Sequence, residues 1–121
     1  MSKIDFKAKF EKFESLWSPR IVAEMNGQYV KVAKAKGELM WHTHDREDEF
    51  FLVLKGRLRV HLRDRVITLD PAQGFVVPRG VEHKPSAEEE THFLLIEPKT
   101  TLHTGDTQSE RTVGIEDQEW V

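Results

Sequence analysis

Aromatic residues recur at helical spacing near the start of the chain. Four rings follow one another at intervals of four, three and four positions: Phe6, Phe10, Phe13 and Trp17. This spacing places the four side chains on one face of a helix, and Pro19 cannot continue such a helix. The pattern predicts a short N-terminal α-helix over about residues 5–17. We expect its aromatic face to pack across the wall of the domain or against a partner subunit.

Beyond Pro19 the apolar pattern changes to short alternating runs separated by turn residues, which is typical of β-strands. Asn26-Gly27 is a hairpin turn signal between the first two runs. The expected strands are 21–25, 28–33, 39–44, 49–54, 57–63, 66–69, 75–77 and 91–97. Short strands with no second helix between them predict an all-β antiparallel sandwich or barrel over about residues 20–98. A polar C-terminal tail over 99–121 would follow, with Trp120 docking it somewhere.

The run 49–54 is apolar on both faces of its expected strand. Phe51 and Val53 point one way, whereas Phe50, Leu52 and Leu54 point the other. A strand with one solvent-exposed face would alternate apolar and polar residues instead. We therefore expect the outer face to be covered by another sheet, by the helix or by a second subunit. A homodimer is the expectation.

Composition narrows the class of protein. The chain has 121 residues, enough for one domain over 1–121 but too few for two ordinary ones. Its formal net charge of -3 and its scattered basic residues argue against nucleic-acid binding. The absence of cysteine excludes disulfides and thiolate chemistry. No apolar stretch approaches the roughly 18 residues of a membrane span and no signal peptide is visible, so a cytoplasmic location is expected.

Three histidines and a glutamate have the chemistry of a metal site. His42 and His44 are two positions apart on an expected strand, which puts both imidazoles on one face. Imidazole pairs suit a transition metal. Glu49 begins the next expected strand, and a returning hairpin can bring its carboxylate opposite the two rings. His83 follows a second tight turn and offers another ligand.

These stretches resemble the two motifs of the cupin family. The first reads Gly37-x4-His42-x-His44-x4-Glu49-x6-Gly56, and the second reads Ala72-x5-Pro78-x-Gly80-x2-His83-x3-Ala87. The sequence departs from the family pattern at Ala72 and Ala87, where glycine and asparagine are usual, and the first glycine is one residue nearer His42. The chain looks especially like the small single-domain cupins that are often labelled mannose-6-phosphate-isomerase-like. The resemblance covers about residues 28–98.

The resemblance implies both a fold and a ligand set. The fold would be an antiparallel double-stranded β-helix, the jelly-roll or cupin barrel. The metal ligands would be His42, His44, Glu49 and His83. Histidine and carboxylate ligands suit one divalent ion of zinc, iron, nickel, manganese or copper, and the sequence does not choose among them.

Other candidates receive weaker roles. Glu47 could compete with Glu49 as a ligand, but we expect it to lie in a solvated loop. The three glutamates at 88–90 are expected to form a solvated turn. His61 is expected to be solvent-exposed, and no role is assigned to His103. His92 is expected as a core histidine, with contact to a metal ligand as the alternative. The barrel-lining side chains are expected to include Met40, Phe51, Val53 and His92.

Fold and ligands do not select a reaction, because one such site supports isomerases, dioxygenases, lyases and cyclases. The first hypothesis is a metal-dependent enzyme acting on a small oxygen-rich molecule, with Glu49 leaving the metal to accept a proton. The alternative is a non-catalytic cupin that binds or senses a small ligand. A structural or storage-like dimer is the third hypothesis, and the four intact ligands argue against it.

Overall fold

The computed structural model describes residues 2–99 and 118–121. One helix, α1 (Phe6–Phe10), precedes seven strands: β1 (Arg20–Met25), β2 (Gln28–Glu38), β3 (Glu49–Lys55), β4 (Leu58–Leu62), β5 (Val66–Leu69), β6 (Gly74–Val77) and β7 (His83–Pro98). A two-residue strand, β8 (Glu119–Trp120), lies at the C-terminus. No helix among the described residues is long and apolar enough to cross a membrane.

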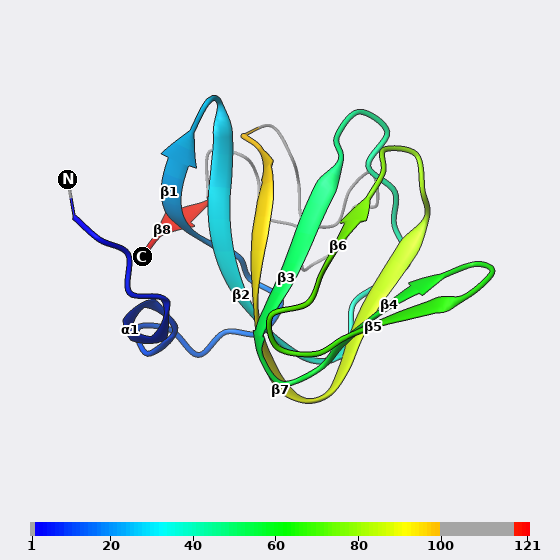
Figure 1. Cartoon of the computed structure of the whole chain (residues 1–121), viewed down its shortest axis with the longest axis horizontal. Helices are drawn as coiled ribbons and strands as arrows, with labels where there is room; N and C mark the ends of the chain where they lie inside the picture. The colour runs from blue at the N-terminus through cyan, green and yellow to red at the C-terminus, as the bar shows by residue number, and fades with distance from the viewer. Residues whose placement is uncertain (1, 100–117) are drawn as a thin grey trace.

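The sixteen-residue strand β7 organises the sheet. The hydrogen-bonded order is β5-β4-β7-β2-β1-β8, and β3 pairs with both β7 and β6. The first half of β7 pairs with β4 and its second half with β3, always antiparallel. The sheet therefore bends around one interior, and α1 lies outside it beside β2 (Figure 1). The predicted all-β jelly-roll barrel is confirmed.

Alternation along the strands divides the apolar residues into two clusters. Residues that face inward form the main core, and Phe51, Val53, Leu58, Val60 and Phe93 are all at most 3% exposed there. The second cluster lies on the outer face of β2, where Phe10 and Phe13 pack over Val32. The helix thus covers part of the barrel wall, which is one of the two arrangements expected from its aromatic face.

The predicted helix over 5–17 is wrong beyond Phe10. α1 ends at Phe10 with Glu11 as its C-cap, and Leu16 instead forms a parallel bridge with Lys34 of β2. The backbone N–H of Trp17 donates to the Lys34 carbonyl at 2.8 Å, with φ at 55°. Pairing with the edge of the sheet therefore overrides the helical period. It sends Trp17 into the main core while Phe10 and Phe13 stay outside.

The predicted strand over 39–44 is also wrong. This segment lies beside the start of β7, but only His42 and His83 form a bridge, with N–H···O distances of 2.9 and 3.0 Å. Leu39 donates to the carbonyl of Pro85, and Pro85 has no N–H to return a ladder bond. A continuous ladder is therefore interrupted.

Residues 88–90, predicted as a turn, lie within β7 and are exposed. Ala35 of β2 pairs with Thr91, whereas Gly37 pairs with Ala87. One residue of β2 therefore opposes three of β7, which marks a bulge where β7 passes from one half of the sheet to the other. A bulge explains consecutive exposed glutamates without a chain reversal.

The end of the chain docks on β1, as Trp120 suggested. Glu119 and Trp120 pair in parallel with Arg20 and Ile21. The indole of Trp120 makes an edge contact with Tyr29 at a centroid distance of 5.8 Å. Most of the predicted tail, 100–117, lies outside the described residues, and so does His103.

Candidate metal centre

Four side chains converge from three parts of the chain. His42 and His44 come from the segment between β2 and β3, Glu49 is the first residue of β3, and His83 is the first residue of β7. One potential ligand atom from each lies within 4.8 Å of all the others. All four residues are buried, with exposed fractions of 0% to 3%. The structure therefore brings the four predicted metal-site residues together.

The distances within the cluster are short and even. Ring centroids lie 4.3 Å apart for His42 and His83, and 5.1 Å apart for His42 and His44. Oε1 of Glu49 lies 3.5 Å from Nε2 of His44 and 3.4 Å from Nε2 of His83. Three imidazoles and one carboxylate oxygen thus surround a common centre.

Backbone carbonyls orient two of the imidazoles. Nδ1 of His42 lies 2.9 Å from the carbonyl of Met40, and Nδ1 of His83 lies 2.9 Å from the carbonyl of Val81. A carbonyl only accepts, so each Nδ1 must donate, and the lone pair of each neutral ring resides on Nε2. Nε2 of His83 is buried and has no well-formed hydrogen bond to any described residue. A metal ion would accept that lone pair, so the donor set fits a divalent transition metal.

Burial determines the charge state of the cluster. It lowers the pKa of His42 to about 4, with repulsion from His83 adding to the effect. Burial alone would raise the pKa of Glu49, but the neighbouring imidazoles of His44 and His83 hold it well below its usual range. At neutral pH the site therefore offers a neutral His42 ring and an ionised carboxylate, both ready to bind a cation.

A second carboxyl group lies behind Glu49. Burial, together with the Glu49 carboxylate beside it, raises the pKa of Glu97 well above its usual range. Glu97 is 0% exposed, and the antiparallel register of β3 with β7 sets it opposite Glu49. Its Oε1 also lies 2.8 Å from Nζ of Lys31. The sequence analysis missed Lys31 and Glu97. Each alternates with apolar residues that face inward on the same strand.

The interior space beside the ligands is very small. A cavity of about 20 Å³ touches His42 and Glu49, and Trp17, Leu39 and Phe51 help to close it. That volume suits roughly one water molecule. Trp17 was predicted to cover the outside of the domain, so its place beside the metal-site residues was also missed.

Two of the other histidine predictions are wrong. His92 is neither a core residue nor part of the barrel lining, because it stacks on Phe10 outside the barrel at 4.4 Å and binds Glu90 at 2.9 Å. His61 is half-buried rather than exposed, and its Nε2 lies 2.7 Å from Oγ of Ser86. Glu47, the rival ligand, is not part of the four-residue cluster.

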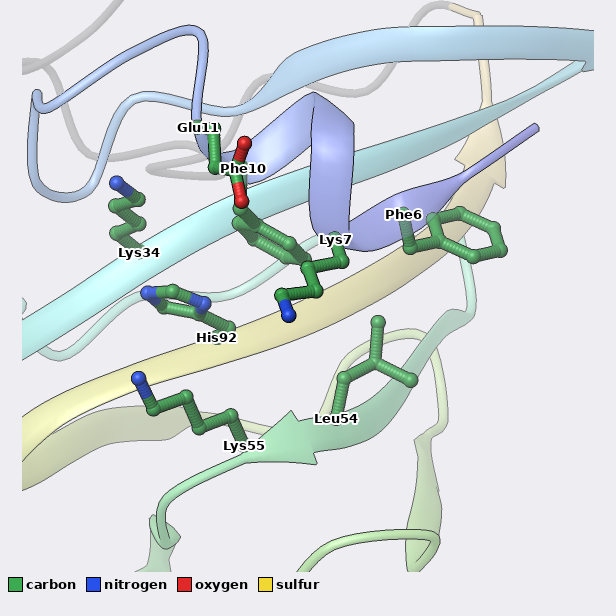
Figure 2. A pocket seen from close by; sticks show the side chains of 8 residues that line it. All are labelled: Phe6, Lys7, Phe10, Glu11, Lys34, Leu54, Lys55 and His92. Carbon is green, nitrogen blue, oxygen red and sulfur yellow. The ribbon is translucent and has the colours of Figure 1, made fainter.

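A larger pocket of about 600 Å³ lies outside the barrel, between α1 and the strands β2, β3 and β7 (Figure 2). Phe6 and Leu54 line one end, and Lys34, Lys55 and His92 line the other. The carboxylate of Glu90 already binds His92 and is stabilised by both lysines. One carboxylate of the same chain therefore offsets part of the positive charge at this end of the pocket.

Comparison with known proteins agrees with the fold and identifies the family. The family model described as "Cupin domain" matches residues 28–97. The uncharacterized protein YdbB of Bacillus subtilis (strain 168) is 33% identical over 79 residues, which cover 64% of this chain and 70% of that protein.

Solved structures extend the comparison. A cupin-2 domain containing protein from Shewanella frigidimarina NCIMB 400 has 47% identity and a TM-score of 0.78, covering 78% of this chain and 93% of its own. Protein NMB1881 from Neisseria meningitidis has 28% identity and a TM-score of 0.74, covering 80% and 99%. Hydroquinone 1,2-dioxygenase PnpCD, in complex with Cd²⁺ and 4-hydroxybenzonitrile, has 17% identity and a TM-score of 0.63, covering 74% and 69%. At that identity it shares the fold alone.

Proposed function

The chain belongs to the cupin-domain family, and on that premise we propose that it holds one divalent transition-metal ion with His42, His44, Glu49 and His83. The observation that carries the proposal is the buried convergence of these four side chains. Zinc, iron, nickel, manganese and copper all accept such ligands. A coordinated ion would also offset the cost of burying an ionised carboxylate among imidazoles.

We further propose that the protein is a metal-dependent enzyme acting on a small oxygen-rich molecule. A bound metal would supply Lewis-acid or, for iron and copper, redox chemistry. The neutral rings of His42, His44 and His83 would hold the ion, and Glu49 would hold it and accept a proton from the substrate at a carboxylate oxygen. The 20 Å³ cavity favours a small substrate or one that displaces Trp17 or Leu39. Isomerase, dioxygenase, lyase and cyclase reactions all remain within this proposal.

Metal content is the first test. Protein purified without a histidine tag should contain about one equivalent of a single metal by elemental analysis, or take it up on reconstitution. His42→Ala should lose that metal, whereas the matched variant His61→Ala should keep it, because His61 lies outside the cluster. A native protein that binds no metal after reconstitution would contradict the proposal. Iron or copper would direct the search towards oxygen chemistry, and zinc or manganese towards isomerase, lyase or cyclase reactions.

The proposed role of Glu49 as proton acceptor has its own test. Glu49→Gln keeps an oxygen ligand but removes the basic carboxylate, so turnover should be abolished while metal binding is only weakened. Glu47→Gln, two residues away and outside the cluster, should leave both unchanged. Full activity in Glu49→Gln would refute the role.

A non-catalytic ligand-binding cupin is the second candidate, because the same four side chains would hold a metal that binds a small ligand without turnover. The cavity of about 20 Å³ limits the size of a ligand and of a substrate equally. Steady product formation from any oxygenated substrate by the metal-loaded protein would favour the enzyme. Saturable binding without product would favour the binding protein. The cytoplasmic location stays a prediction.

We also propose that the protein forms a homodimer through the outer face of β3 and β6. Val76 is 50% exposed and Leu54 is 36% exposed, and the half-buried Phe50 and Leu52 face the same way. Val76→Glu should shift the mass measured by light scattering after gel filtration from dimer to monomer. Val66→Glu, at a similarly exposed position on β5, is the control that should remain dimeric. A monomeric native protein at micromolar concentration would contradict the proposal.

A further inference from the structure

A lysine and a glutamate are paired inside the barrel. Nζ of Lys31 on β2 lies 2.8 Å from Oε1 of Glu97 on β7, and the two side chains are 1% and 0% exposed. Removing two charges from water has a desolvation cost that often exceeds the attraction between them, and apolar residues of similar size commonly serve stability as well. Stability alone is therefore a weak reason for burying a lysine and a glutamate together.

The position of the pair relates it to Glu49. Phe50 of β3 pairs with Ile96 of β7, so continuing the antiparallel register by one residue sets Glu49 opposite Glu97. Both side chains alternate with inward-facing apolar neighbours, and both are buried. Facing cross-strand neighbours have Cβ atoms about 4.5–5.5 Å apart, so Lys31, Glu97 and Glu49 follow one another in a buried row.

We propose that Lys31 and Glu97 are positioning residues that fix the orientation of the Glu49 carboxylate toward the metal. This inference rests on the proposed metal site. An unsupported glutamate side chain has three rotatable bonds and can turn either oxygen toward an ion. Glu97 occupies the facing position on β7 and is held by Lys31, so the two residues limit the directions in which the Glu49 carboxylate can turn. Partners behind metal-binding side chains orient them in this way in many metal sites.

Co²⁺ is the probe, because its visible absorption bands report the number and geometry of its ligands. Titration of the metal-free native protein should give one Co²⁺ per chain with a defined spectrum. Absence of Co²⁺ binding by the native protein would count against the metal site itself, before any variant is measured. The inference about Lys31 and Glu97 is then tested only on differences from that native spectrum and affinity.

The decisive variant is Lys31→Met combined with Glu97→Leu, which removes both charges and keeps an apolar volume. It should fold cooperatively, as judged by circular dichroism, because neither charge is left buried alone. Its Kd for Co²⁺ should rise about 10- to 100-fold, the range found when partners of metal ligands are removed, and its spectrum should change. Glu97→Gln, which keeps the size and a polar carbonyl of the side chain, should retain most of the native affinity and spectrum.

Thr91→Val is the matched control on β7. It removes a buried hydroxyl that hydrogen-bonds the backbone of Arg57, so it should lower stability without changing the Co²⁺ spectrum. A native Kd and spectrum in the Lys31→Met, Glu97→Leu variant would overturn the inference. If that variant does not fold, Lys31→Met combined with Glu97→Gln decides, because it also leaves neither charge buried alone: an altered spectrum supports the positioning role, and an unaltered one refutes it.

Discussion

Replacement of Trp17 by alanine tests how the N-terminal segment closes the barrel. Trp17 is 5% exposed, belongs to the main core and lies against Phe93 at a centroid distance of 6.4 Å. Its Nε1 donates to the carbonyl of Lys36 at 3.0 Å. The indole also lines the small cavity that touches His42 and Glu49. Loss of the ring should therefore affect stability and the space beside the proposed metal.

The magnitude follows from these contacts. Truncating a buried tryptophan to alanine costs about 3–5 kcal/mol, which combines lost apolar burial with the void left behind. Loss of the bond to the Lys36 carbonyl is part of the same range, at about 1 kcal/mol. We expect the free energy of unfolding to fall by about 4 kcal/mol, which corresponds to about 15 °C in Tm for a chain of this size. That is a large share of the roughly 5–15 kcal/mol typical of a domain.

Urea denaturation followed by far-ultraviolet circular dichroism is the assay, because the substitution removes a fluorophore. Trp41→Ala is the matched control. Trp41 is half-buried and packs under the guanidinium of Arg63 at 3.7 Å from the ring centroid, so its loss should cost only about 1 kcal/mol. A loss below about 1 kcal/mol for Trp17→Ala would refute the reasoning, since it would mean that the indole does not fill the core.

Backbone geometry gives a second, sharper outcome at the same position. The φ angle of Trp17 is 55°, a left-handed conformation that costs a residue with a Cβ about 1–2 kcal/mol. Glycine avoids that cost. It loses more conformational entropy on folding than alanine does, which lowers the free energy of unfolding by about 0.5–1 kcal/mol. Trp17→Gly should therefore be at least as stable as Trp17→Ala, the reverse of the usual order. A clearly less stable glycine variant would show that the alanine variant leaves the left-handed conformation.

Three further predictions concern the turns and the metal. Gly56→Ala should lower the free energy of unfolding in urea by at least about 2 kcal/mol, because φ is 87° and the new Cβ would lie 2.5 Å from Oγ1 of Thr91. Gly27→Ala has open space around the new Cβ, so its free energy of unfolding should fall by about half as much. Ala72→Gly should raise the unfolding free energy by up to about 1 kcal/mol, since Ala72 has a φ of 69°; an unchanged or lower value would contradict this. Saturating Zn²⁺ should raise the Tm of the native protein and a chelator should reverse the rise, whereas His42→Ala should show no shift.

The metal-site residues could be predicted because their geometry is mostly local. His42 and His44 share a short segment with Glu49, and the structure keeps that segment folded back on itself. His83 lies much further along the chain, and only the resemblance to a family motif connected it to the others. The structure adds the reason for its position, which is the isolated bridge between His42 and His83.

The remaining features depend on pairings between distant strands. Glu97 faces Glu49 only because β7 pairs with β3, and Lys31 joins them only because β7 also pairs with β2. No local period contains that information. The predicted length of the N-terminal helix was wrong for the same reason, because Trp17 pairs with the backbone of β2 instead of continuing α1.

The inward-facing surface of the barrel combines two kinds of environment, and their separation explains how the site can exist in a small protein. Around Val53, Leu58 and Val60 the interior is apolar and fully buried, and this part supplies the favourable burial that holds the fold. The ligand cluster and the pair Lys31–Glu97 add buried polar groups that are costly without partners. A bound cation would supply a partner for the Nε2 lone pair of His83, which is buried without a well-formed hydrogen bond to any described residue. Metal binding and folding stability should therefore be coupled in this chain, so that the metal-free protein is the less stable form.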